Sequence, residues 1–87
     1  MSSESQVLLY PIHTEKAINY IEKYNTLIFA VSRTATKQQI REEFERKFGA
    51  KVEKVRTLIT MRGEKRALIK LSPESSAEEI ATRLGLL

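Results

Sequence analysis

The sequence predicts a single α+β domain, a plait-like sandwich in which a small, mainly antiparallel sheet packs against helices in the order α-β-α-β-β-α. Three observations support this fold class: capping boxes at two helix starts, an apolar run typical of a buried strand, and a hairpin pattern that contains a glycine. A chain of 87 residues corresponds to one domain. We expect residues 1–6 to be a flexible polar tail and residues 7–87 to form the domain.

Three helices are predicted, at about residues 15–24, 37–48 and 77–84, each behind a Ser or Thr that can cap its first turn. Thr36 and Ser76 each begin a capping box, because Gln or Glu follows three residues later. Each helix carries an apolar stripe at helical spacing, which we expect to face the core. These stripes are Ala17, Ile21 and Tyr24; Ile40, Phe44 and Phe48; and Ala77, Ile80, Ala81 and Leu84.

Three strands are predicted. Residues 27–31 are apolar on both faces, so this strand should lie centrally in the sheet, covered on both sides. Residues 51–60 and 65–71 form a hairpin around a short turn that contains Gly63. Residues 7–10 are interpreted as an apolar lead-in that stops at Pro11 and are not counted among the strands.

The composition excludes several kinds of chemistry. The chain has no Cys and no Asp, and His13 is its one histidine, so disulfides, thiolate zinc sites and multi-histidine metal sites are ruled out. No glycine-rich phosphate loop is present. The longest purely apolar run has five residues, against roughly 20 for a membrane helix. We expect a cytoplasmic protein without cofactor, metal, small-molecule substrate or membrane partner.

Two features could still suggest catalysis. His13 could act as a general base, but the sequence places neither an acidic partner nor a serine nucleophile beside it, which favours a surface or RNA-facing residue. Glu42, Glu43 and Glu45 could form a carboxylate pair. A solvated helix face that pairs with neighbouring basic residues is the favoured interpretation. We expect no enzymatic activity.

The positive charge is concentrated in one stretch. The chain has a net charge of +4, whereas residues 51–70 alone hold seven basic residues against two acidic ones, a net +5. Such a patch is typical of nucleic-acid binders, although a solvated, lysine-rich strand pair that resists edge aggregation would look the same. Residues 51–60 contain no aromatic side chain, which disfavours base stacking on the sheet. RNA contacts should therefore go to phosphates and 2′-hydroxyls.

The candidate RNA-binding residues lie on the second helix and around the hairpin, with two weaker candidates before them. They are Lys16, Arg33, Lys37, Arg41, Arg56, Thr57, Arg62, Lys65, Arg66 and Lys70.

An ordered series of motifs resembles the universal large-subunit ribosomal protein family number twenty-three. Residues 11–16 match its P-x-x-[ST]-E-K opening, and Asn25-Thr26, Ala35-Thr36-Lys37, Val52-x-x-Val55-x-Thr57, Gly63-Glu64-Lys65-Arg66-Ala67 and Arg83-Leu84-Gly85 follow in order over residues 7–87. The short turn at residues 61–64 is similar to the archaeal branch. Arg56 stands where the family often has Asn, and a guanidinium is at least as good a phosphate ligand.

The resemblance implies a non-enzymatic, ribosome-associated protein that binds large-subunit rRNA beside the mouth of the polypeptide exit tunnel. It implies the neighbouring ribosomal protein number twenty-nine and nascent-chain factors such as signal recognition particle as partners, with Glu15 at the docking position. The alternative is a non-ribosomal protein–protein adaptor that uses its acidic C-terminal helix. Cosedimentation with the large subunit would distinguish the two.

Overall fold

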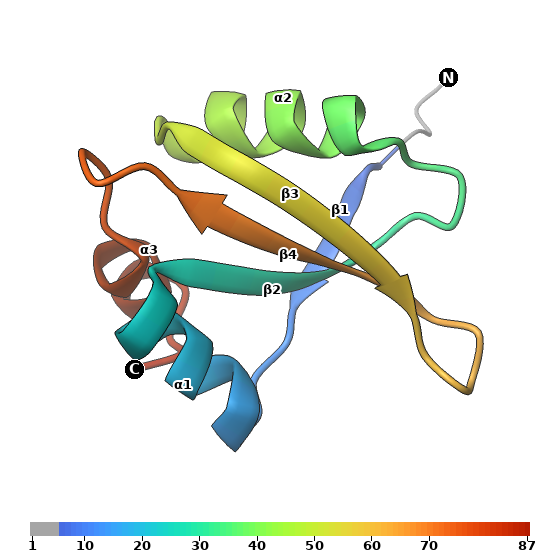
Figure 1. The fold of residues 1–87 in the computed structure, drawn as a ribbon, viewed down its shortest axis with the longest axis horizontal. Coiled ribbons are helices and arrows are strands. Elements are labelled where there is room, and N and C mark those ends of the chain that lie inside the picture. The colour runs from blue at the N-terminus through green and yellow to red at the C-terminus, as the bar shows by residue number, and fades with distance from the viewer. Residues whose placement is uncertain (1–5) are drawn as a thin grey trace.

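The computed structural model describes residues 6–87, which form three helices and a four-stranded antiparallel sheet (Figure 1). The predicted flexible tail falls almost entirely on residues 1–5, which lie outside the described residues. The elements are β1 (Leu8–Pro11), α1 (Glu15–Tyr24), β2 (Thr26–Val31), α2 (Lys37–Phe48), β3 (Val52–Ile59), β4 (Lys65–Leu71) and α3 (Ala77–Arg83). The sheet order is β1-β2-β4-β3, so β2 is central as its two apolar faces predict.

The α+β class and the three helices are confirmed, but the predicted element order omits a strand. Residues 8–11 form β1, which pairs antiparallel with β2 at the edge of the sheet. This strand has four residues and a register shift between Leu8 and Tyr10, so it carries no alternation long enough to recognise. Pro11 is tolerated in it because an edge strand can do without one backbone donor.

Local hydrogen bonds account for the helix starts. The Thr14 hydroxyl accepts from the Ala17 N–H, and Ser76 caps α3 in the same way. At α2 both halves of the capping box are present, with the Thr36 hydroxyl accepting from Gln39 N and the Gln39 side chain accepting from Thr36 N. Because these bonds join residues three apart, the local sequence is enough to predict them.

Alternation along the strands divides the sheet into two faces. On the first face, α2 packs against β2, where the Phe29 ring lies 5.9 and 6.0 Å from the ring centroids of Phe44 and Phe48. Figure 1 shows α2 along the top of the sheet, with α1 and α3 together at the opposite lower corner. Ile21 of α1 and Ile80 of α3 join the same apolar core.

The second face is covered only over β1 and β2, where Ala17 of α1 packs with Ile12 and Ala30. In the part formed by β3 and β4, no helix among residues 6–87 covers the exposed side chains of Lys54, Arg56, Leu58 and Lys70, and we call this part the open face. It consists of three register pairs: Lys54 opposite Lys70, Arg56 opposite Leu68, and Leu58 opposite Arg66.

Tyr24 departs from its predicted place in the core. Ala17 and Ile21 are buried, but the Tyr24 side chain is 56% exposed and packs against the Tyr20 ring instead. Helical spacing predicts which residues share a face, but not how far along the helix the partner surface extends. Here the buried contacts of α1 stop one turn before its end.

Asn25 joins four elements at one point. It ends α1 in the left-handed conformation, with φ +53°. Its side-chain Oδ1 accepts from the Ala77 N–H at 2.7 Å, and its Nδ2 donates to the carbonyls of Leu71, Ser72 and Ser75 at 3.0–3.4 Å. Its own carbonyl accepts from Leu71 N at 3.0 Å. The side chain therefore connects α1 and β2 to the end of β4 and the start of α3.

We predict that Asn25→Ala lowers the free energy of unfolding by about 2–4 kcal/mol, since several side-chain hydrogen bonds are lost and a Cβ residue other than Asn must adopt the left-handed conformation. Urea denaturation measures this as a lower midpoint with an unchanged m-value. Asn25→Gly, which tolerates that conformation, should lose less. Asn19→Ala, at an exposed position of α1, is the control. Equal stability of Asn25→Ala and Asn19→Ala would contradict the role of Asn25.

Candidate nucleic-acid interface

The open face gathers cations that are far apart in the sequence. Lys54 and Arg56 of β3 lie beside Lys70 of β4, and all three side chains are exposed. Arg66 lies further along β4 on the same face and is partly buried. Within residues 6–87, side-chain ion pairs form only between Arg46 and Glu43 and between Arg66 and Glu64, so none of these residues forms an ion pair with Lys54, Arg56 or Lys70.

A groove of about 400 Å³ runs between α1 and this cationic end of the open face. Tyr20 and Tyr24 of α1 line one side, Leu68 lies between the cations, and Thr26 lies at the start of β2. The two tyrosine rings are 5.3 Å apart between centroids and tilted by 56°. The buried Thr26 hydroxyl donates to the Tyr24 carbonyl at 2.9 Å, which connects the last residue of α1 to the start of β2.

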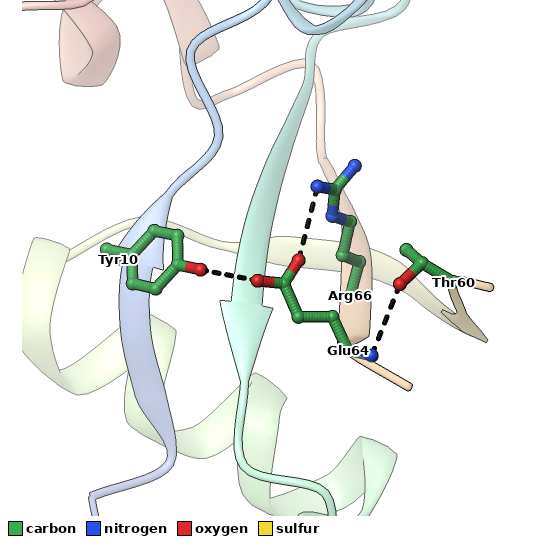
Figure 2. Close-up of polar contacts among 4 residues, drawn as sticks. All are labelled: Tyr10, Thr60, Glu64 and Arg66. Carbon is green, nitrogen blue, oxygen red and sulfur yellow. Dashed lines mark hydrogen bonds and ion pairs between the residues drawn. The ribbon is translucent and has the colours of Figure 1, made fainter. Parts of the chain in front are cut away.

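At the other end of the open face, a polar network crosses the sheet (Figure 2). The Tyr10 hydroxyl of β1 reaches across β2 and donates to Glu64 Oε2 at 2.8 Å, while Arg66 Nη2 donates to Glu64 Oε1 at 3.2 Å. The Glu64 N–H donates to the Thr60 hydroxyl, which holds the turn. The hydrogen bond from Tyr10, followed by the bond and charge of Arg66, lowers the pKa of Glu64. The same bond to the carboxylate raises the pKa of Tyr10.

The hairpin end of the sheet brings together a second group of predicted residues. Lys65 Nζ donates to the Ala35 carbonyl at 2.7 Å, and the Arg33 carbonyl lies 3.5 Å away. A Cβ atom at Gly63 would lie 3.5 Å from Arg33 Nη1, so this guanidinium lies against the turn. Arg62 is exposed in the turn itself. From Lys65 to Lys70 the strand spans about 17 Å, which separates the two basic ends.

The remaining candidates are not brought to the open face. Arg41 donates to the Val52 carbonyl at 2.8 Å, so it supports β3 from α2. Thr57 is paired with Ala67 on the opposite face of the sheet from Arg56. Lys37 is exposed at the start of α2, and Lys16 is exposed in the first turn of α1.

Among residues 6–87, neither possible catalytic feature forms a site. His13 is exposed between β1 and α1. Glu43 pairs with Arg46, and Glu45 accepts from the Val52 N–H at 2.9 Å. In the part of the chain that the structure describes, no three His, Cys, Asp or Glu side chains gather closely enough to hold a metal ion. No helix among residues 6–87 has the length and apolar character needed to cross a membrane.

Sequence reasoning missed four residues of this interface. Lys54 lies in the basic stretch but was not selected, although it shares the strand parity of Arg56. Tyr20 and Tyr24 are four residues apart, which marks a shared helix face. No sequence pattern pointed to Tyr10, because residues 8–11 were not predicted to form a strand.

The fold and the open face define a small antiparallel α+β domain whose distinguishing surface is cationic. The family model described as Ribosomal protein L23 matches residues 6–79, and the chain belongs to this family. It is similar to the Large ribosomal subunit protein uL23 of Methanothermobacter thermautotrophicus, with 49% identity over 80 residues that cover 92% of this chain and 93% of that relative. The protein is therefore a structural ribosomal protein and not an enzyme.

We predict that Tyr10→Phe raises the pKa of Glu64 toward its ordinary value, because the largest cause of the lowered pKa is the Tyr10 hydrogen bond. In the wild type, the Glu64 contribution to stability is present above the unfolded-state pKa and is lost as the pH falls through the folded-state pKa. An NMR titration of the side-chain carboxyl carbons measures the shift. Tyr24→Phe removes a distant hydroxyl and should leave Glu64 unchanged. An unaltered Glu64 titration in Tyr10→Phe would show that the bond is absent in solution.

Proposed function

We propose that this protein is a constituent of the large ribosomal subunit that binds rRNA through the open face and the hairpin end. Family membership supports the ribosomal assignment and favours it over a non-ribosomal adaptor. The observation that carries the RNA-binding surface is the row formed by Lys54, Arg56 and Lys70, which no carboxylate within residues 6–87 neutralises by an ion pair. Phosphates are the natural counter-ions of such a row.

The predicted RNA-binding residues have different roles in this proposal. Arg56, Arg62 and Lys70 are exposed and are the primary phosphate ligands. Arg66 is partly neutralised by its ion pair with Glu64. The Lys65 ammonium group donates a hydrogen bond to the Ala35 carbonyl in the loop after β2. Arg33 and Lys37 extend the hairpin-end surface toward α2. The same proposal retains Lys16, Arg41 and Thr57 only as peripheral contacts.

A second surface is proposed for protein partners. Glu15 is exposed in the first turn of α1, nine residues and about 14 Å along the helix from Tyr24. Nascent-chain factors at the exit tunnel, signal recognition particle among them, would dock there while the open face stays on RNA. Ribosomal protein number twenty-nine is the proposed neighbour within the subunit.

Binding to a large-subunit rRNA transcript should depend strongly on salt. About five phosphate contacts predict a slope of roughly −3.5 to −4.5 when the logarithm of the association constant is plotted against that of the salt concentration. Filter binding across a salt series measures it. A slope near zero would refute the electrostatic account.

Charge reversal should show where the RNA lies. Arg56→Glu should weaken binding to the transcript by about tenfold or more, because a charged contact is replaced by repulsion. Arg66→Glu should weaken it less than Arg56→Glu, since Glu64 already shares that charge. Arg83→Glu makes the same change of charge at an exposed position on α3, and Glu78→Lys and Glu79→Lys test the acidic helix. Equal effects of Arg56→Glu and Arg83→Glu would rule out the open face.

A further inference from the structure

We propose that the groove between α1 and the open face holds one unpaired nucleotide of the bound RNA. Its base lies against Tyr24, and its adjoining phosphates lie on Lys54, Arg56 and Lys70. This inference rests on the proposed function and specifies the form of RNA that the site takes.

The tyrosines give the groove an aromatic side that the strands alone lack. The Tyr24 side chain is 56% exposed, although its spacing from Ala17 and Ile21 would suit a core position. The Tyr20 and Tyr24 rings are tilted by 56° rather than stacked on each other, so the exposed Tyr24 ring keeps a face for another planar group. Base stacking on aromatic side chains is the common way in which proteins hold unpaired nucleotides.

The cations indicate that the ligand also carries negative charge, which in a nucleotide lies on the phosphates and not on the planar base. Lys54 and Lys70 are direct cross-strand partners, and like charges in this position destabilise a sheet. Arg56 adds a third positive charge on the same face, next to the apolar Leu68. No ion pair within residues 6–87 relieves this repulsion, whereas an anionic ligand would. An aromatic wall with a row of cations matches a nucleotide better than a simple anion.

The shape of the site separates an unpaired nucleotide from a duplex. In an A-form helix the bases are stacked inside, and side chains cannot enter the deep, narrow major groove. A duplex could therefore touch the exposed cations but could not place a base beside Tyr24 inside the groove. An extruded base presents its planar face and its own backbone phosphates together, in the combination that Tyr24, Leu68 and the three cations offer.

The test uses the full chain and a large-subunit rRNA transcript in filter binding. Tyr24→Ala should raise the Kd by about 5- to 150-fold, the range expected for one stacked base, while Tyr24→Phe keeps the ring and should stay within about twofold of the wild type. The salt slope should stay unchanged in Tyr24→Ala, because stacking releases no counter-ions, and should shrink by about one in Arg56→Ala.

A second measurement follows the base directly. The chain has no tryptophan, so Tyr24→Trp introduces a single indole at the groove. Its emission should be quenched by the transcript and not by poly-glutamate, which has the charge without the bases. Quenching by poly-glutamate but not by the transcript would overturn the proposal in favour of an acidic peptide.

The outcomes separate this inference from the function on which it rests. If the wild type does not bind the transcript, or if Arg56→Glu binds as well as the wild type, the RNA-binding function itself fails. If Arg56→Glu weakens binding while Tyr24→Ala has wild-type affinity and Tyr24→Trp emission does not respond, the function stands and the nucleotide site is wrong.

Discussion

The hydrogen bonds of Asn25 are the constraint on which the arrangement of the second face depends. A left-handed residue must end α1 before the chain enters β2, and Asn25 adopts that conformation while its side chain bonds to the end of β4 and the start of α3. Because one amide group connects these elements, the direction of α1 relative to the sheet is determined at its last turn. The placement of Tyr24 beside β3 and β4 follows from this junction.

The open face exists because α1 covers only part of the sheet. Ala17 packs over β1 and β2, and the helix then ends at Asn25 instead of continuing across β4. The uncovered strands carry charged side chains, since no helix among residues 6–87 packs on this face of them and it is in contact with solvent. Because α1 covers only half of the sheet, the same sheet contributes to the buried core and carries an exposed cationic surface, and the groove beside Tyr24 lies at the boundary between them.

Features that depend on interactions between residues close in the sequence were predicted correctly, whereas features that depend on distant residues were not. The starts of α1, α2 and α3 were correct because their caps join residues three apart. Strand β1 was missed because it is defined by pairing with β2, some twenty residues later in the chain. The basic stretch was located correctly, but its alternate residues point to opposite faces, which is why Thr57 and Arg56 separate.

The sequence by itself determined the fold class, the helix caps, the central apolar strand and the concentration of positive charge in residues 51–70. Only the tertiary structure decided which of those charges remain available. Lys65 donates to a backbone carbonyl, Arg66 pairs with Glu64, and Lys54 is placed opposite Lys70. The physical reason is that cross-strand register and helix placement arise from contacts between distant segments, whereas composition and periodicity report only on neighbours along the chain.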